Sequence, residues 1–557
     1  MRAFVQPTWH TLLSLALLLL CFCTFLVPHA SSANQASANG GFKIAGTVVN
    51  SVTGAPLGKA RITLMDAANR ANFLSVITAD NGHFEFYSLN RGKYSLEGAK
   101  RGFISAGYEQ HEEFSTAIVT GGDFNTENLV LRLTPLALLG GKVLDESGEP
   151  VRKANVRLFI DNQQGGRRRT VPVGADTTDD QGYYEFSGLA PANYFIAVSA
   201  KPWYAIPSFS SRRNRYLSSP NLSSSLDVAY PTTYNNGTTD SQSATPISIQ
   251  AGDHVQVDMH LSPVPVLHLI FRIPQAEQQG VSMPAFETRV FDSREYVQVE
   301  GMQSSSPGVY EMAGIPAGKY TVRFMDPKSG QAQQSTEMNL TSDGQELDLS
   351  QAQPSASVKL SFKMPRQETP TQQVNIALLD SRRQVAGFQA INATGEVEFE
   401  NIPAGKYSIL VFSRNNRYSV ARIVSGGVET LGHDLTFAPG SSLSMTVFLA
   451  VGLVNVEGFA FRGHKPCSGV MVALVPKDPQ AHLEMFRRDQ SDSDGSFTLP
   501  AVIPGTYTLI AVEDAWGFQW QQPDVLNRYL QHGQTLTIGE LMTNIVHLPE
   551  PVEVQPH

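Results

Sequence analysis

Short runs of alternating apolar and polar residues recur along the chain and predict β-strands throughout. Five turn glycines mark the clearest copies: Gly82, Gly182, Gly308, Gly395 and Gly495. Apolar residues stand two and four positions after each glycine, and Leu, Ile or Val stands seven positions after it. Because successive side chains on a strand point to opposite faces, this spacing predicts strands with one buried face.

A tyrosine follows each turn glycine at one fixed offset. A small residue stands ten positions after the glycine, and twelve positions after it stand Tyr94, Tyr194, Tyr320, Tyr407 and Tyr507. Five copies in one register indicate a role that every repeat needs. We predict that each ring is buried beside a corner and that its hydroxyl bonds to upstream backbone, as in the tyrosine corner of β-sandwiches.

The repeat length predicts domains rather than a solenoid. Successive tyrosines lie 100, 126, 87 and 100 residues apart, close to one small β-sandwich and well beyond solenoid units. A proline precedes each new apolar run, and short linkers that contain proline are semi-rigid, so we expect about five sandwiches in an extended array. The predicted modules span 39–135, 136–263, 264–354, 355–439 and 440–557, with breaks near Pro135, Pro263, Pro354 and Pro439.

Three modules share a further pattern, a glycine-led strand that turns at Gly and Pro and then returns. The positions are Gly46, Gly54 and Pro56; Gly141, Gly148 and Pro150; and Gly458, Gly463 and Pro466. With the turn glycine and the tyrosine, this pattern resembles the carboxypeptidase regulatory-like domain, which is similar to transthyretin-like and Cna-B-like sandwiches. Modules three and four match only its second half. The resemblance implies an all-β fold of tandem Greek-key β-sandwiches, a secreted or surface setting in bacteria, and no catalysis.

The first 38 residues follow a different pattern. Arg2 precedes an uncharged apolar stretch over residues 12–27, and small and polar residues follow with cleavage sites after Ala33 or Ala38. This order predicts a secretory signal peptide over residues 1–38. An uncleaved anchor is the alternative, but the apolar core falls short of the roughly 20 residues that a spanning helix needs. We expect an exported chain that is periplasmic, outer-membrane-associated or secreted, with no transmembrane span once mature.

Charge and cysteine content narrow the function further. The chain carries 42 Lys and Arg against 51 Asp and Glu, and its basic cluster is a short loop at Arg167, Arg168 and Arg169, so we expect no nucleic-acid partner. Beyond the signal segment only Cys467 remains. No disulfide within the mature chain can support the modules, and each must rely on its own apolar core.

Motifs for catalysis or metal binding are absent from the sequence. It contains neither His-Glu-x-x-His nor Gly-x-Ser-x-Gly. His111 beside Glu112 and Glu113, and His547 with Glu550, lack further ligands nearby in sequence. We therefore predict no catalytic residues, no cofactor and no metal site.

Two Asp-rich turns resemble part of a calcium loop. Asp492 and Asp494 precede Gly495, and Asp179 and Asp180 precede Gly182. Because each sequence passes directly into a strand without the closing Glu of such a loop, we favour ordinary turn chemistry. Calcium binding stays an open alternative.

Aromatic residues in two module-specific segments are the candidates for ligand contact. They are Trp203, Tyr204, Tyr230 and Tyr234 in the second module, and Trp516 and Trp520 in the fifth. Such rings can grip a peptide or stack on sugar, or they can pack their own loops. We expect a non-catalytic scaffold or binding protein that engages a protein or glycan through module loops. A specific carbohydrate-binding protein and an accessory regulatory chain of a peptidase or other enzyme are the alternatives, and ligand identity and oligomeric state stay open.

Overall fold

The computed structural model describes residues 41–557, except 123, 165–166, 207–225, 273–283, 298, 300, 326–331, 348–351, 364–373, 414–416, 431–432, 480–481, 521 and 541–543. The predicted signal peptide over residues 1–38 lies outside the described residues. Strands dominate the described part of the chain, as the all-β prediction requires. No helix in this part is long and apolar enough to cross a membrane.

The first sandwich packs two sheets around one apolar core. One sheet has the order β4-β1-β8, and the other has the order β3-β2-β5-β6 with β7 also on β5. Their bounds are β1 (Phe42–Asn50), β2 (Arg61–Asp66), β3 (Phe73–Ile77), β4 (His83–Leu89), β5 (Gly92–Ala99), β6 (Ala106–Gly107), β7 (Ile118–Thr120) and β8 (Leu129–Leu133). The alternating residues Phe84 and Phe86 are buried in this core, which confirms the strand predicted after Gly82.

The second sandwich repeats this plan with one more strand in its first sheet. Its sheets have the orders β12-β9-β17, with β18 on β9, and β11-β10-β13-β15, with β16 on β13. Their bounds are β9 (Ala137–Leu144), β10 (Asn155–Gln164), β11 (Arg167–Thr177), β12 (Tyr183–Leu189), β13 (Ala192–Ser199), β15 (Thr233–Tyr234), β16 (Ile247–Ile249), β17 (His254–Gln256) and β18 (Met259–His260).

The third sandwich receives a strand from the segment before it. Its sheets have the orders β14-β19-β23-β22, with β26 on β19, and β21-β20-β24-β25-β27. Their bounds are β14 (Val228–Ala229), β19 (Val264–Arg272), β20 (Pro284–Val290), β21 (Ser293–Val297), β22 (Gly301–Ser306), β23 (Val309–Pro316), β24 (Gly318–Met325), β25 (Ala332–Leu340), β26 (Glu346–Leu347) and β27 (Gln353–Pro354). Because β14 pairs with β19, the module-two insertion is hydrogen-bonded to the third sandwich.

The fourth sandwich extends further along the chain than the sequence suggests. Its sheets have the orders β31-β28-β36-β33-β34 and β30-β29-β32-β35. Their bounds are β28 (Ala356–Lys363), β29 (Asn375–Asp380), β30 (Val385–Ala390), β31 (Glu396–Ile402), β32 (Gly405–Phe412), β33 (Tyr418–Ser425), β34 (Val428–Thr430), β35 (Asp434–Phe437) and β36 (Ser442–Val451). The boundary predicted after Pro439 is wrong, because β36 pairs with β28 and β33 of this sandwich. Pro439 marks a turn within the module.

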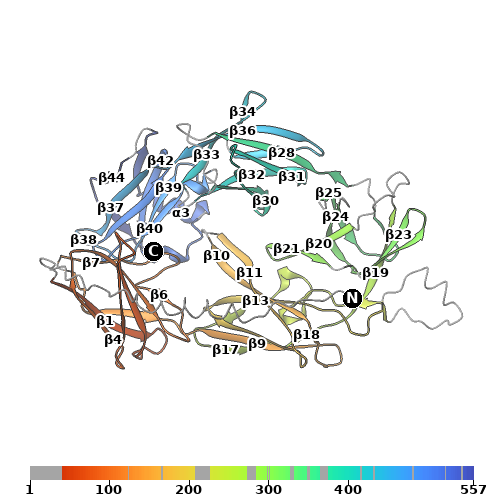
Figure 1. Ribbon diagram of the computed structural model, residues 1–557, viewed down its shortest axis with the longest axis horizontal. Coiled ribbons are helices and arrows are strands. Elements are labelled where there is room, and N and C mark those ends of the chain that lie inside the picture. The colour runs from red at the N-terminus through yellow and green to blue at the C-terminus, as the bar shows by residue number, and fades with distance from the viewer. Residues whose placement is uncertain are drawn as a thin grey trace, which may run out of the picture.

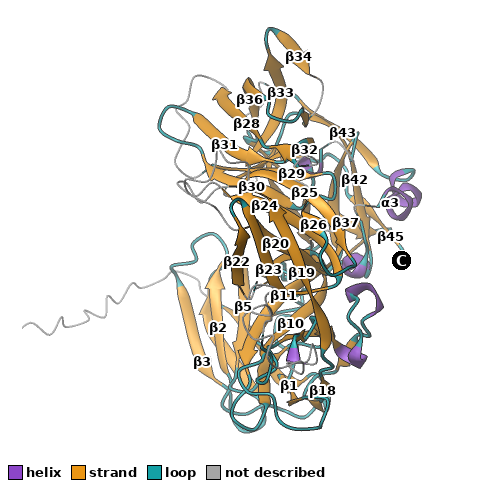
Figure 2. Cartoon of the chain, turned by 90° about the vertical axis from the view of Figure 1, so that its right-hand side faces the viewer, coloured by secondary structure: helices purple, strands orange, loops and turns teal. Residues whose placement is uncertain are grey.

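The fifth sandwich joins its two layers through its last strand. β45 pairs with β37 of one layer and with β42 of the other. The strands are β37 (Val454–Arg462), β38 (Lys465–Pro466), β39 (Met471–Pro476), β40 (Arg487–Gln490), β41 (Ser496–Val502), β42 (Gly505–Val512), β43 (Gln534–Ile538), β44 (Val546–His547) and β45 (Val552–Gln555). Helix α3 (Pro523–Leu530) lies beside β42 (Figure 2).

The repeated tyrosines form one hydrogen bond five times over. Each hydroxyl donates to the carbonyl of the residue four positions earlier. The acceptors are the carbonyls of Asn90, Ala190, Pro316, Pro403 and Ile503. The rings of Tyr194, Tyr320, Tyr407 and Tyr507 are buried, whereas that of Tyr94 is half-buried. The predicted hydrogen bond is confirmed in all five modules, and the predicted burial of the ring is confirmed in four of them.

The five sandwiches form a closed circuit, and the expected extended array is wrong. Figure 1 shows the first sandwich, in red and brown, beside the blue fifth sandwich. Hydrogen bonds link these two modules directly, for example from Lys93 to Asp492. A further bond crosses the circuit, from the Arg169 guanidinium to the Arg383 carbonyl over 2.8 Å. The semi-rigid linkers therefore turn the chain back on itself.

A largely buried charge cluster attaches the module-two insertion to the third sandwich. His268 on β19 bonds to Asp227 over 2.6 Å through Nε2 and to Glu311 over 2.8 Å through Nδ1. The hydrogen bond with Asp227 raises the pKa of His268 to about 9; burial opposes this effect, and the bond with Glu311 reinforces it. His268 is therefore a cation in the folded protein at neutral pH.

We predict that this junction loses stability as the pH rises. Because the pKa of His268 is higher in the folded than in the unfolded protein, its protonation stabilises the folded state. This contribution is fully present below about pH 6.5 and is lost as the pH rises through about 9. The loss should reach up to about 3 kcal/mol, measured by urea denaturation of the full chain near pH 6 and pH 9.5. His268→Gln should flatten this dependence, and an unchanged slope in that variant would contradict the assignment.

Candidate functional site: the contact between the first and last sandwiches

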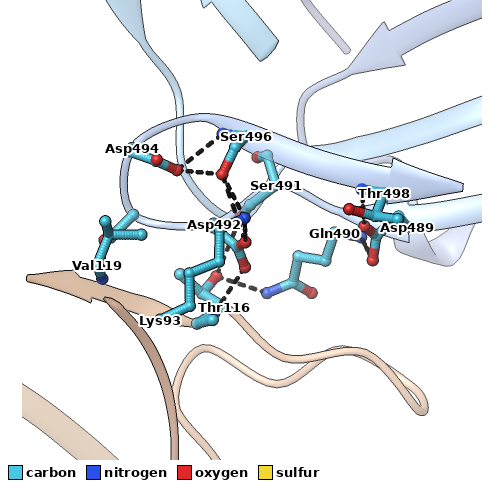
Figure 3. Close-up of polar contacts among 12 residues, drawn as sticks. Lys93, Thr116, Val119, Asp489, Gln490, Ser491, Asp492, Asp494, Ser496 and Thr498 are labelled. Carbon is cyan, nitrogen blue, oxygen red and sulfur yellow. Dashed lines mark hydrogen bonds and ion pairs between the residues drawn. The ribbon is translucent and has the colours of Figure 1, made fainter. Parts of the chain in front are cut away.

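The closure contact joins residues 93 and 109–119 of the first sandwich to residues 488–496 and 516 of the fifth. Figure 3 shows its polar part, where side chains from the β40–β41 turn meet β7 and the segment that precedes it. These segments are about 400 residues apart in the sequence, so the contact depends on the path of the whole chain.

Asp492 is central to the closure contact. Its Oδ1 accepts the Ala117 backbone N–H over 2.9 Å, and its Oδ2 accepts Lys93 Nζ over 2.6 Å. Lys93 Nζ also donates to Ser496 Oγ over 2.7 Å. The Asp492 side chain is 15% exposed and that of Lys93 is 37% exposed, so the ion pair is partly removed from water and is screened less than a fully exposed pair.

One turn position bonds within its own turn in two other modules but bonds to the first sandwich in the fifth module. Three positions before the turn glycine, Asp179 and Asn392 accept backbone N–H groups of their own turns. In the fifth sandwich Asp494 takes over this local task by accepting the Ser496 N–H over 3.0 Å. The Asp492 carboxylate is thereby directed at the first sandwich.

Neighbouring groups extend the polar contact on both sides of Asp492. Gln490 Nε2 donates to the Glu109 carbonyl over 2.6 Å and to Thr116 Oγ1 over 2.8 Å. Ser493 Oγ accepts the Val119 N–H over 2.9 Å, and the Ser493 N–H donates to the Ala117 carbonyl over 3.0 Å. Backbone and side-chain groups of the two sandwiches thus satisfy one another, much as in a protein–protein interface.

An aromatic cluster adds apolar contact beside these bonds. The Trp516 ring stacks on His111 with centroids 5.3 Å apart and lies 5.5 Å from Phe114. The Arg488 guanidinium lies over Phe114 and over Trp520, and it pairs with Glu112 over 2.8 Å. Stacked rings and an enclosed guanidinium are typical of stable interfaces.

Two carboxyl groups at the contact have altered acidity. Burial raises the pKa of Asp489 to about 7, although its oxygens accept the N–H groups of Thr498 and Gln490. Burial also raises the pKa of Asp492, and the charge of Lys93 acts in the opposite direction. The contact is suited to holding two modules together, and protonation of Asp492 weakens its pairing with Lys93.

The structure separates the candidate aromatic residues into two groups. Tyr230, Tyr234, Trp516 and Trp520 are only 6%, 2%, 8% and 7% exposed. Trp516 belongs to the closure contact, and Trp520 packs on Phe486 with centroids 4.8 Å apart. In this structure these four rings pack within and between modules.

Trp203 differs from the other candidates because its ring is 89% exposed. It meets Tyr204 edge to face, with centroids 5.8 Å apart. The hydroxyls of Tyr204 and Tyr230 both bond to the carboxylate of Glu146, which fixes Tyr204 and offers Trp203 a rigid neighbour. Ligand contact at Trp203 and Tyr204 stays a prediction.

The Asp-rich turns have protein partners for the carboxylates considered above. Asp179 Oδ1 accepts two backbone N–H groups of its own turn, and Asp180 pairs with Arg152 over 2.7 Å. Asp492 and Asp494 bond to Lys93, Ala117 and Ser496. Asp179 and Asp494 show the turn chemistry that the sequence favours, whereas Asp492 bonds to the neighbouring sandwich.

Comparison with known families agrees with the repeat. The carboxypeptidase regulatory-like domain matches residues 43–132 and 139–205. The first two sandwiches resemble this family. In the fifth sandwich, residues 447–536 match the second β-sandwich domain of BOS complex subunit NOMO1-like proteins.

Curated relatives are similar over part of their length. Serine-aspartate repeat-containing protein F of Staphylococcus epidermidis is 23% identical over 290 residues, covering 48% of this chain and 16% of that protein. Serine-aspartate repeat-containing protein D of Staphylococcus aureus is 21% identical over 390 residues, covering 63% and 27%. The chain therefore spans about a quarter or less of these two relatives.

Solved structures with similar domains include the Bacillus anthracis TIE protein, at 10% identity and a TM-score of 0.17, with 75% of this chain and 76% of that chain covered. Two B repeat units of the collagen binding protein of Staphylococcus aureus are 12% identical, with a TM-score of 0.13 and coverage of 73% and 99%.

Proposed function

We propose that this chain is an exported, non-catalytic scaffold that binds a protein partner through the loops of its closed circuit of sandwiches. The observation that carries the proposal is Trp203, a large apolar ring that is 89% exposed on a segment that the sister modules lack. Isolated exposed tryptophans of this kind are typical anchors of protein interfaces.

The surroundings of Trp203 favour an interface. Tyr204 is held by Glu146, whose carboxylate also binds the buried Tyr230, so the ring pair needs little ordering on binding. A preorganised anchor loses less conformational entropy when it binds. The match of the fifth sandwich to a domain of a complex subunit also supports a protein partner. A glycan that stacks on the ring is the competing ligand.

The closed circuit supports a scaffold because it fixes the spacing between module loops. The repeated tyrosines serve the fold of each module, which leaves recognition to the module-specific segments. A signal-directed chain of this kind would work at the bacterial envelope or outside the cell.

Trp203→Ala should weaken capture of the partner by more than about 1 kcal/mol, roughly fivefold or more in Kd, while the melting temperature stays unchanged. Pull-down from the native envelope identifies the partner, and titration of the purified partner measures the affinity. A glycan array run in parallel separates the competing ligand. Tyr87→Ala is the matched control, since it removes a 56% exposed ring from the first sandwich.

Capture that is unchanged in Trp203→Ala would overturn the proposed contact. Loss of capture in Tyr87→Ala to the same extent would show a general surface effect instead. If the chain binds one array glycan selectively and Trp203→Ala abolishes that binding, the ligand is a carbohydrate and not a protein.

A further inference from the structure

A second cluster of functional side chains lies where the fourth and fifth sandwiches meet. His433 directly precedes β35 of the fourth sandwich. His482 and Glu484 come from the fifth sandwich, between β39 and β40, and Glu484 lies in the short 3₁₀ helix η8 (Leu483–Met485). Two imidazoles and one carboxylate therefore converge from two modules.

The three donor atoms are spaced as ligands of one ion. His433 Nε2 lies 3.0 Å from His482 Nδ1 and 3.5 Å from Glu484 Oε1, and His482 Nδ1 lies 3.7 Å from the same oxygen. A zinc ion with bonds of roughly 2.0–2.2 Å and tetrahedral angles separates its ligands by roughly 3.3–3.5 Å. The observed separations of 3.0, 3.5 and 3.7 Å bracket this range, so shifts of a few tenths of an ångström in the side chains bring the three atoms to it.

Burial and outer contacts favour a bound ion. The side chains of His433 and Glu484 are 8% and 10% exposed, and buried charged or polar groups of this kind generally pair or coordinate a metal. Ser419 donates its hydroxyl to the Glu484 carboxylate. A hydrogen bond of this kind helps to orient a ligating carboxylate.

The cluster also has an entry path. Ser419 and His482 line a cavity of about 940 Å³ at this junction, together with residues of β36 and β42. An ion can therefore approach the cluster from the side of His482, and a fourth ligand can come from water in the cavity. Three protein ligands with one open position are the usual arrangement at accessible zinc sites.

We propose that His433, His482 and Glu484 form a zinc-binding site that joins the fourth and fifth sandwiches. Two imidazole nitrogens select a transition metal over calcium or magnesium, which prefer oxygen ligands. The site goes beyond the scaffold function, because it adds a metal-dependent connection between modules of the circuit. It also differs from the sequence-based expectation of no metal site.

The test loads the full chain with zinc alone. After dialysis against zinc and gel filtration, metal analysis should find about one ion per chain, and isothermal titration should give a single site. Cobalt(II) should produce the visible absorption bands of a low-coordinate N,N,O site, whereas calcium and magnesium should not compete. Zinc should raise the melting temperature, since it binds only the folded junction.

His482→Ala should bind zinc at least about 100-fold more weakly, because even residues that only orient ligands alter affinity 10–100-fold. Its side chain is 33% exposed, so the fold should persist, as circular dichroism can verify. Glu484→Gln keeps the size of the side chain and should give the same direction of change. His254→Ala removes an exposed histidine of the second sandwich and should bind zinc as the wild type does.

Failure of the wild-type chain to retain zinc would overturn the site, and so would unchanged affinity in His482→Ala. Equal loss in His254→Ala would show non-specific binding and would overturn it as well. Capture of the partner by Trp203→Ala is measured in a separate experiment. Failure of the zinc site therefore does not affect the scaffold proposal.

Discussion

Tyr507→Ala should lower the unfolding free energy of the fifth sandwich by about 3–5 kcal/mol, the usual cost of truncating a large buried aromatic side chain. The ring is 1% exposed, and its hydroxyl donates to the Ile503 carbonyl at the corner. Removal of the ring leaves both a cavity and an unpaired buried carbonyl. Hydrogen exchange of peptides from β42 in urea, with the other modules as internal references, measures the loss.

Two variants separate the contributions of this corner. Tyr507→Phe keeps the ring and removes only the hydroxyl, so it should lose about 1–2 kcal/mol. Tyr94→Ala should cost less than Tyr507→Ala, because the Tyr94 ring is half-buried. Exchange of β42 that matches the wild type in Tyr507→Ala would refute the structural role of the repeated tyrosine.

The tyrosine corner could be predicted because it is local and repeated. Its donor and acceptor stand four residues apart, and five copies at one offset separate the signal from chance. Strand alternation near each turn glycine is equally local, and the pairing of β1 with β4 through Phe84 and Phe86 follows it. Short-range patterns of this kind specify a module regardless of its neighbours.

The arrangement of the modules could not be predicted in the same way. Lys93 and Asp492 lie 399 residues apart, and the sequence around Asp492 looks like any Asp-x-Gly turn. Pro439 illustrates the same limit at a boundary, since a proline in a turn between β35 and β36 has the same local signature as a linker. Long-range pairing decides both cases.

The His433, His482 and Glu484 cluster was missed for a related reason. Its ligands come from two modules, and a search for one compact motif does not join them. The short spacing of His482 and Glu484 was the one local signal, and by itself it is common on exposed segments. Likewise, the sequence predicts all three of Trp203, Trp516 and Trp520 as candidates for ligand contact, whereas the structure shows that only Trp203 among them is exposed.

Lys93→Glu should open the closed circuit. The substitution removes the partner of the largely buried Asp492 carboxylate and places a like charge beside it. Because the Lys93 side chain is 37% exposed, the expected cost lies below the roughly 3–5 kcal/mol for breaking a fully buried pair. Small-angle scattering should show a larger radius of gyration. Hydrogen exchange should rise at residues 116–119 and 490–493, while each sandwich core stays protected.

Lys59→Glu is the matched control, because it makes the same charge change at an exposed site of the first sandwich. It should leave the scattering profile unaltered. A profile for Lys93→Glu that equals the wild type would mean that the aromatic cluster of Trp516, His111 and Phe114 closes the circuit without the ion pair. The double variant Lys93→Glu with Trp516→Ala removes the aromatic cluster as well. A scattering profile that still equals the wild type would contradict a circuit held by this contact.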